Sequence, residues 1–311
     1  MRLIFCGTPD FAVPTLERLI AERFPIDLVV TNPDEPSGRG YELKTPLVKQ
    51  AAMRAGLEVY QPAKLKEPAT AEFLSRYRPD AIVVVAYGHI LPKWMIDLPR
   101  LGCINLHASL LPKYRGAAPI QWALIRGEAV TGVTTMRIDA GLDTGDILLR
   151  REVEIQEDDS SETLGERLSQ LGADLMIETL QRLERGDLVA QPQDHAQATL
   201  APILKKEDGR IDWNLPAMEI RNRIRGLRPW PGAYTRFRGK NLHIWAASRP
   251  VAEESVHLAP GTLVAHRGRL CVACGQGTLL EAKEIQLEGR KRLPVRDFLN
   301  GVKIVPGEQV E

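Results

Sequence analysis

The sequence predicts an α/β domain with a mostly parallel sheet, followed by a smaller domain of the β-barrel type. In the first half, apolar runs of strand length alternate with helix-like segments; in the second half, short strand-like runs are separated by Gly- and Pro-bearing turns. Such alternation predicts a Rossmann-like parallel sheet with helices on both faces. A chain of 311 residues is also long for one domain, so we expect two.

The elements of the first half follow from residue spacing. Strand-length apolar runs occupy residues 2–6, 26–31, 81–86 and 102–107, and helical candidates occupy residues 11–21, 46–55, 69–77 and 118–126. A longer helix is predicted from Ser161 to residue 185, because leucines recur on one face and Gly186 can end it. The segment after the first strand lacks the G-x-G-x-x-G spacing, so a dinucleotide site is not expected.

The change between the halves falls at residues 187–208. This stretch is rich in Gln, Ala and Pro and has no clear apolar period, which indicates a linker. After it come one helix-like piece and several short strands, at residues 216–226, 233–237, 241–246, 261–265, 270–273 and 279–286. We therefore expect an α/β domain at 1–186, a linker at 187–208 and a small β-barrel domain at 209–311.

The end of the predicted strand 102–107 carries an amide and an imidazole. Asn105 and His107 are two residues apart, so they point to the same face of the strand. Open α/β sheets bind ligands at the C-terminal ends of their strands. The loop that follows is apolar, contains proline and carries Ser109, which makes it a wall suited to a flat organic ligand.

A carboxylate-rich loop, residues 139–146, follows a second strand-like run at 132–138. If both strands end at the same edge of one sheet, Asp143 approaches His107. No Ser or Cys nucleophile stands in this set, so it suits attack by a substrate amine on a carbonyl-type carbon. Asn105 and a protonated His107 would hold the oxyanion, and Asp143 would orient His107. Each residue alone is an ordinary turn or loop residue; their combination favours a site.

Charge is distributed unevenly along the chain. Residues 205–311 hold 19 basic and 12 acidic residues, whereas residues 1–204 hold 22 and 28. The small net charge therefore conceals a basic second domain, with Arg290, Lys291 and Arg292 among its clusters. Basic patches on a small barrel suit a phosphate backbone, although a solvated charged face is equally compatible with composition alone.

Cysteine usage and hydropathy favour a reduced, cytoplasmic protein. Cys6 and Cys103 lie in apolar strand-like runs and are expected to be buried thiols. Cys271 and Cys274 form a single C-x-x-C, and in a strand they would face opposite sides, so no metal or redox site is expected. No run of about 18 apolar residues occurs, and the chain starts in a strand-like run, so neither a membrane span nor a leader is expected.

The motif Asn105-Leu-His-Ala-Ser-Leu-Leu-Pro-Lys-Tyr-Arg-Gly116 resembles the signature of the folate-dependent formyltransferases. The similarity extends over residues 1–12, 33–40, 139–146 and 226–234, and within the family it is to the methionyl-tRNA formyltransferases. The resemblance implies a formyltransferase fold with an OB-like barrel, catalytic roles for Asn105, His107 and Asp143, and 10-formyltetrahydrofolate as formyl donor without a metal. It implies that the donor site is lined by Ser109, Leu110, Leu111 and Pro112.

The resemblance also implies initiator methionyl-tRNA as acceptor, and no obligate protein partner is evident. The long loop 33–46 would insert against the acceptor stem, and Arg39 and Lys44 match its basic role. Glu42 stands where relatives often carry another basic residue, so this loop is expected to contribute less charge. Arg290, Lys291 and Arg292 would bind tRNA from the barrel.

Two alternatives follow from the same residues. A formyltransferase acting on a nucleotide amino sugar or on glycinamide ribonucleotide needs the same trio, but neither the Arg39 loop nor a basic second domain. An RNA-binding module with an inactive α/β domain would not need the complete set Asn105, His107 and Asp143. A formylation assay with donor and charged tRNA distinguishes these hypotheses.

Overall fold

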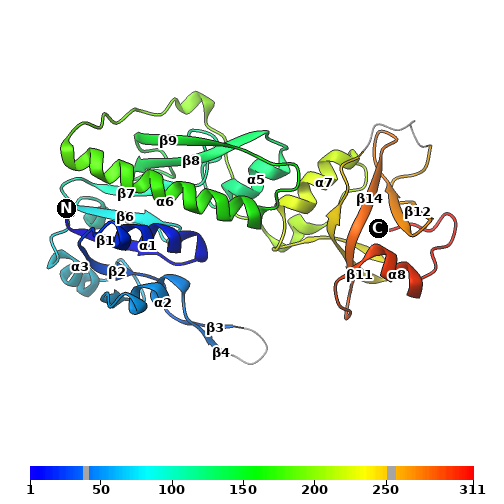
Figure 1. Ribbon diagram of the computed structural model, residues 1–311, viewed down its shortest axis with the longest axis horizontal. Coiled ribbons are helices and arrows are strands. Elements are labelled where there is room, and N and C mark those ends of the chain that lie inside the picture. Colours follow the sequence, from blue (N-terminus) through cyan, green and yellow to red (C-terminus); the bar gives the residue numbers. More distant parts are fainter. Residues whose placement is uncertain (38–41, 251–256) are drawn as a thin grey trace. The chain divides into compact units, whose positions relative to one another are not determined.

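The N-terminal half forms a seven-stranded sheet in the computed structural model, which describes residues 1–37, 42–250 and 257–311. The strand order is β5-β2-β1-β6-β7-β8-β9 (Figure 1). The strands are β1 Leu3–Gly7, β2 Ile26–Val30, β5 Val59–Tyr60, β6 Ala81–Val85, β7 Cys103–His107, β8 Val130–Arg137 and β9 Ile147–Glu154. The first five in that order run parallel, which confirms the predicted sheet.

The two strands at one edge of this sheet break the parallel pattern. β8 runs antiparallel to β7, and β9 runs antiparallel to β8. In this register His107 pairs with Thr134, whereas Arg137 at the end of β8 pairs with Ile104. The loop after β8 therefore leaves the sheet beside Ile104 and not beside the end of β7.

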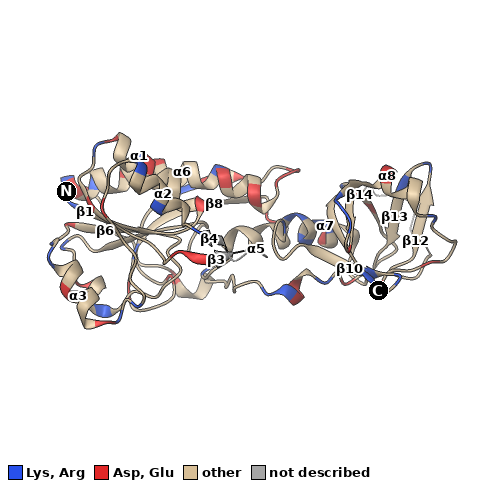
Figure 2. Ribbon diagram, turned by 90° about the horizontal axis from the view of Figure 1, so that it is seen from below, with Lys and Arg blue, Asp and Glu red and all other residues tan. Residues whose placement is uncertain are grey.

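Helices cover both faces of the sheet. They are α1 Val13–Ala21, α2 Leu47–Arg54, α3 Pro68–Ser75, α4 Lys93–Ile96 and α6 Ser161–Arg185, with a short 3₁₀ turn η1 at Asp10–Ala12. A further helix, α5 (Pro119–Ile125), lies almost wholly in the second compact unit of the chain. Figure 2 shows α1, α2 and α6 on one face and α3 on the other. Leu74 of α3 and Met95 of α4 join strand residues such as Ile4 and Ile82 in one buried cluster. β1 and β6 are buried throughout, as expected for parallel strands covered on both faces.

Between β2 and α2 the chain forms a short antiparallel hairpin of β3 (Glu35–Ser37) and β4 (Glu42–Lys44). Asp34 precedes it, and its carboxylate accepts hydrogen bonds from Lys49 Nζ at 2.8 and 2.9 Å and from Gln61 Nε2 at 2.9 Å. The Lys49 ammonium, with the Gln61 amide, lowers the pKa of Asp34. This pairing fixes the start of the loop predicted to reach the acceptor stem.

The C-terminal half forms a six-stranded antiparallel sheet in the order β10-β11-β14-β13-β12, with β15 beside β14. The strands are β10 Ala233–Phe237, β11 Lys240–Ala247, β12 Leu263–His266, β13 Arg269–Ala273, β14 Leu279–Leu287 and β15 Leu293–Pro294. Residues 308–311 bond to Gly261 and Leu263 on one side and to Arg236 on the other, at 2.8–3.2 Å. They close the sheet, which confirms the predicted small β-barrel.

Two helices complete the barrel, α7 (Ala217–Gly226) and α8 (Val295–Gly301). Ile220 and Ile224 of α7 and Phe298 of α8 are buried with barrel residues such as Leu280 and Val272. The barrel thus has a hydrophobic core of its own, as expected of a separately packed domain.

The chain divides into two compact units that are discontinuous in sequence. The first consists of residues 1–119, 130–154 and 165–202, and the second of residues 120–129, 155–164 and 203–311. Within the second unit, Arg221 of α7 donates to the carbonyl of Glu157 at 2.9 Å. The boundaries drawn from the sequence, 1–186, 187–208 and 209–311, stay a prediction.

The first part of the expected linker pairs with the first unit and does not run free. Gln191 exchanges two backbone hydrogen bonds of 2.8 Å with Ile147, and Ala201 N donates to the carbonyl of Arg115 at 2.7 Å. Two 3₁₀ turns, η2 His195–Gln197 and η3 Lys206–Gly209, interrupt this stretch. Residues 187–202 are held through backbone hydrogen bonds, which do not require apolar side chains at regular intervals. The sequence of this stretch therefore resembles that of a linker.

Gly172 lies where α6 comes closest to β7. A Cβ atom at this position would meet Leu106 Cδ2 at 2.6 Å, and Leu106 is buried beside His107. In an open helix, replacing Gly by Ala stabilises by about 0.5–1 kcal/mol. Here the extra methyl would overpack the contact between helix and strand.

We predict that Gly172→Ala lowers the free energy of unfolding by about 1–3 kcal/mol, measured by urea denaturation followed by circular dichroism. The matched control is Gly301→Ala in α8, because a Cβ there would meet nothing within 4 Å. The control should be neutral or slightly stabilising. If both variants behave alike, Leu106 moves aside and the close contact carries no constraint.

Candidate active site

The end of β7 presents Asn105 and His107 on the same face, as predicted, and Leu106 points to α6 on the opposite face. His107 is buried, with 6% of its surface exposed, and Asn105 is half-buried. Within the described residues the Asn105 carboxamide makes no hydrogen bond. Its N–H donors therefore remain available to a bound molecule.

The His107 ring lies between two acceptors. Nε2 is 2.9 Å from the carbonyl oxygen of Tyr114, and Nδ1 is 3.6 Å from Asp143 Oδ2. The first distance is a hydrogen bond, whereas the second is an ion-pair distance too long for one. The carboxylate of Asp143 thus stands beside the ring nitrogen that the Tyr114 carbonyl does not engage.

Asp143 reaches His107 by a different route from the one expected. The loop after β8 starts beside Cys103, where Ile138 N donates to the Cys103 carbonyl at 2.8 Å, and folds back toward the end of β7. Asp143 itself has φ of 52°, a left-handed conformation that non-glycine residues rarely adopt. Its Oδ2 accepts a hydrogen bond of 2.8 Å from Gly116 N. The carboxylate is thus held in place.

The loop after β7 is fastened to β8. Thr134 Oγ1 donates to the Ser109 carbonyl at 2.6 Å and accepts from Leu111 N at 3.2 Å. Ser109 Oγ in turn donates to the Lys113 carbonyl at 2.7 Å. The Ser109 hydroxyl is therefore committed to the loop's own structure.

The four residues assigned to the donor wall differ in exposure. Ser109 and Leu111 are 0% exposed, whereas Leu110 and Pro112 keep part of their surface accessible. Only Leu110 and Pro112 of these four therefore present side-chain surface to the outside, and the assignment of all four to the donor site stays a prediction.

Two buried polar residues behind the Asp143 loop were not identified from the sequence. Gln193 donates to the carbonyls of Asp143 and Gly145, at 2.9 and 2.7 Å, and accepts from Arg115. Arg115 lies within the motif Asn105–Gly116, so the sequence did mark this position as belonging to the site region. Gln193 lies in the supposed linker, where no pattern marked it.

The basic residues assigned to tRNA binding differ in their exposure and in their ion pairs. Lys44 is exposed, and Arg39 lies outside the described residues. The exposed side chains of Arg290 and Lys291 have no ion pair in the parts of the chain that the structure covers. Arg292 pairs with Glu284 and lies 5.1 Å from the centroid of the Trp245 ring. Arg292 is therefore already paired within the barrel.

The cysteines are all free thiols, as expected. Cys6, Cys103 and Cys274 are buried, and burial raises the pKa of Cys103 and of Cys274 to about 12. Among the described residues no group of three or more His, Cys, Asp or Glu side chains could hold a metal ion. No helix in the same residues is long and apolar enough to cross a bilayer.

Together these side chains offer an uncommitted amide donor, an imidazole ring and a fixed carboxylate. Such a set can stabilise negative charge that develops on a carbonyl oxygen and accept a proton from a nucleophile. None of these three side chains is a serine hydroxyl or a cysteine thiol.

Both halves of the chain match known protein families. Residues 1–180 match the formyl transferase family, and residues 203–303 match the formyl transferase C-terminal domain. The chain is 58% identical over 306 residues to a methionyl-tRNA formyltransferase of Koribacter versatilis, covering 97% of this chain and 96% of that protein. It is 57% identical to the enzyme of the same description from Acidobacterium capsulatum, covering 98% of each.

A solved structure of similar fold is WlaRD, a sugar 3N-formyl transferase crystallised in the presence of dTDP and 5-N-formyl-THF. The TM-score is 0.69 at 17% identity, covering 94% of this chain and 99% of that one. At this identity the likeness concerns the fold alone.

The bonds of Thr134 generate a prediction about the loop after β7. Thr134→Val keeps the shape of the side chain but leaves the Ser109 carbonyl and the Leu111 N–H buried and unpaired, so we expect a loss of about 2–4 kcal/mol in the free energy of unfolding. Thr134→Ser keeps the hydroxyl and should cost about 1 kcal/mol for the lost methyl. Urea denaturation measures both. Equal losses would show that packing, not the hydroxyl, holds the loop.

Proposed function

The chain belongs to the methionyl-tRNA formyltransferases of the formyl transferase family, and from this premise we propose that it transfers a formyl group from 10-formyltetrahydrofolate to the α-amino group of initiator methionyl-tRNA. The bond from the formyl carbon to N10 breaks, a bond to the amine nitrogen forms, and one proton passes from the amine to N10. The product is N-formylmethionyl-tRNA for translation initiation, and we propose the cytoplasm as the compartment because translation consumes it there.

This reaction does not require the enzyme to create a strong nucleophile. An α-amine has a pKa of about 8 or below, so a useful fraction is neutral near pH 7. The enzyme must hold the formyl carbon close to the amine and stabilise the tetrahedral intermediate. The absence of a Ser or Cys nucleophile from the site described above agrees with that requirement.

The uncommitted carboxamide of Asn105 is the observation that carries the proposal. It stands two residues from His107 on the same strand face, with no hydrogen bond among the described residues. A donor left unpaired at a half-buried position is available to the oxygen of the formyl group. As that oxygen becomes negative in the transition state, the hydrogen bond strengthens.

His107 and Asp143 supply charge in this proposal. With Nε2 on the Tyr114 carbonyl and Nδ1 toward Asp143, His107 contributes positive charge beside the oxyanion. Asp143 favours that charged form and offers the carboxylate that takes up the proton released by the amine. Leu110 and Pro112 are the residues that we assign to the apolar wall beside the folate.

We predict that the wild-type protein formylates methionyl-tRNA in the presence of 10-formyltetrahydrofolate. Asn105→Ala and His107→Ala should each lower the single-turnover rate about 100- to 1000-fold, the usual cost of losing one oxyanion-stabilising group. Asp143→Asn should also slow transfer and change the pH–rate profile, because the neutral amide cannot favour a charged His107. Donor binding, followed by fluorescence titration, should be retained in all three variants.

The same assay separates the alternatives. A nucleotide amino sugar and glycinamide ribonucleotide are offered as acceptors beside initiator and elongator methionyl-tRNA. Transfer to a small acceptor in preference to tRNA would contradict the proposal. Near-normal rates in Asn105→Ala or His107→Ala would remove that residue from the mechanism.

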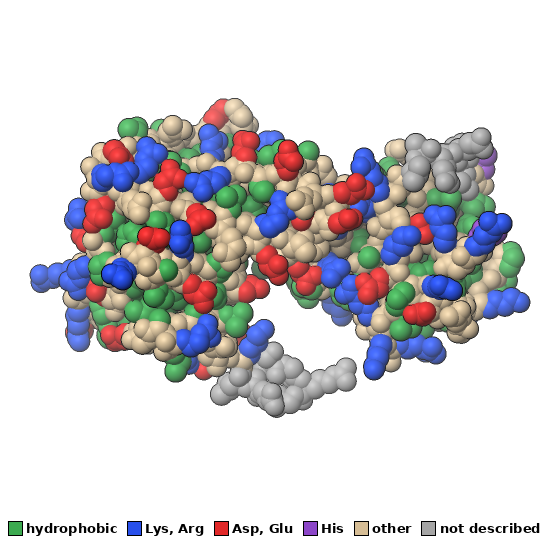
Figure 3. Space-filling model, viewed as in Figure 1, with side chains coloured by type: hydrophobic (Ala, Val, Ile, Leu, Met, Phe, Trp, Pro, Cys, Tyr) green, Lys and Arg blue, Asp and Glu red, His purple; other side chains and the backbone are tan. Residues whose placement is uncertain are grey.

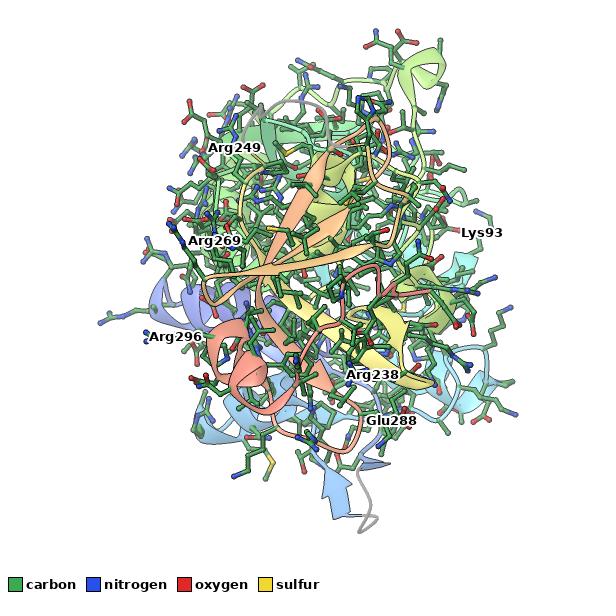
Figure 4. The ribbon with its side chains drawn as sticks, turned by 90° about the vertical axis from the view of Figure 1, so that its right-hand side faces the viewer. Lys93, Arg238, Arg249, Arg269, Glu288 and Arg296 are labelled. Atoms are coloured by element: carbon green, nitrogen blue, oxygen red, sulfur yellow. The ribbon has the colours of Figure 1, made fainter. Side chains whose placement is uncertain are left out.

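We assign tRNA binding to basic side chains of the barrel together with Arg39 and Lys44. Figure 3 shows Lys and Arg side chains at several places over the barrel, and Figure 4 shows Arg269 and Arg296 on one side of it and Arg238 on another. Many of these cations are paired: Arg238 with Glu308, and Arg269 with Glu281. Cations without such partners are the better candidates for phosphate contacts.

Among the described residues, Arg290 and Lys291 have no such partner. The same is true of Arg267 and Arg296 elsewhere on the barrel.

We predict that Arg290→Gln/Lys291→Gln weakens tRNA binding and lowers the slope of log K against log salt by about 1 for each cation removed. The control Arg267→Gln/Arg296→Gln removes the same charge from another place. Adding Arg292→Gln to the first pair should change little, because Glu284 neutralises Arg292. Equal effects of both double variants would show a diffuse field and no defined contact face.

A further inference from the structure

A buried amide and a buried guanidinium lie behind the Asp143 loop, and the mechanism above does not use them. Gln193 is 6% exposed and Arg115 is 7% exposed. Gln193 Nε2 donates to the carbonyls of Asp143 at 2.9 Å and Gly145 at 2.7 Å, and Oε1 accepts from Arg115 Nε at 3.2 Å and Nη2 at 2.7 Å. The amide has two donors and two acceptor positions, all in use, so its orientation is fixed.

Arg115 stands between the two residues that hold the proposed catalytic pair. On one side, the Tyr114 carbonyl takes the hydrogen bond of His107 Nε2. On the other side, Gly116 N donates to the Asp143 carboxylate. The Arg115 backbone is itself paired with Thr199 and Ala201, at 2.8 and 2.7 Å. A single segment, residues 193–201, thus fastens both loops of the site.

The guanidinium of Arg115 is held by neutral groups. Nη2 lies 3.0 Å from His195 Nδ1, and within the described residues no carboxylate is at ion-pair distance from Arg115. Burying a cation without a counter-charge costs free energy, and an apolar side chain would fill the same space more cheaply. The buried pair of Gln193 and Arg115 is therefore better explained by a need to fix the position of the Asp143 loop than by a need for stability.

We infer that Gln193 and Arg115 are positioning residues for formyl transfer, an inference that rests on the proposed function. They hold the loop of Asp143 in its left-handed conformation, with the carboxylate facing His107. Gln193 bonds to the backbone on both sides of Thr144, so a change in the Asp143 backbone strains or breaks the hydrogen bond to its carbonyl. A misplacement of about 1 Å in such a site typically costs about 100-fold in rate.

The test uses Gln193→Glu in the full chain. The carboxylate keeps its partner Arg115 but loses the two N–H donors, and its charge repels the carbonyls of Asp143 and Gly145. We expect the single-turnover rate of formyl transfer to fall about 10- to 100-fold, with KM for donor and tRNA changed less than about threefold. Gln193→Met, which removes the donors without adding charge, should lower the rate in the same way.

The matched control is Gln191→Glu. It makes the same charge change two residues away, and the Gln191 side chain is exposed while only its backbone pairs with Ile147. This variant should keep the wild-type rate. A loss equal to that of Gln193→Glu would mean that charge in this segment, and not the grip on the loop, affects transfer, and it would overturn the inference.

A double-mutant cycle distinguishes positioning from general damage. If Gln193 acts through Asp143, then Gln193→Glu should cost little more in an Asp143→Asn background, and its pH–rate profile should move toward that of Asp143→Asn. If the two losses multiply, Gln193 is a structural residue and the inference is wrong.

Hydrogen exchange measured by mass spectrometry supplies a readout independent of activity. Peptides covering residues 139–146 should exchange faster in Gln193→Glu and Gln193→Met than in Gln191→Glu, with or without a working formylation assay. Failure of wild-type formylation would refute the proposed function and leave this result intact. Unchanged exchange, or faster exchange with a normal transfer rate, would overturn the positioning role.

Discussion

The path of the loop between β8 and β9 is the constraint on which the rest of the site depends. β8 is antiparallel to β7 and ends beside Ile104, so the chain must fold back before Asp143 can stand at His107. That return path has no regular secondary structure to support it. Instead, Gly116 holds the carboxylate of Asp143, and Gln193 holds its carbonyl. The electrostatics of the site therefore rest on loop-to-loop hydrogen bonds.

Polar contacts hold most of the polar side chains of the site. His107, Asp143 and Arg115 each make hydrogen bonds, and the loop that carries Leu110 and Pro112 is fastened to Thr134. Placement of a donor and a charge pair is the main contribution that a site without a nucleophile can make to catalysis.

Counting the basic residues of the barrel overstates how many of them are free to bind a phosphate. Residues 205–311 carry a clear excess of basic residues, yet several of them are matched within the barrel. The Arg269 hydrogen bond, with help from Lys283, lowers the pKa of Glu281 to about 2, which keeps that carboxylate ionised beside its partners. Arg238 and Arg292 are matched in the same way. The cations without such partners are the ones that we propose for phosphate contacts.

The sequence by itself determined the elements whose signals are local. Strand-length apolar runs located the sheet, a two-residue spacing put Asn105 and His107 on one face, and turn-separated strands located the barrel. The tertiary structure alone decided the return of the Asp143 loop, the backbone pairing of residues 187–202, the burial of Ser109 and Leu111, and the contacts of Gln193. These depend on antiparallel pairing and on backbone hydrogen bonds between segments far apart in the chain, and such bonds leave no period in the side chains.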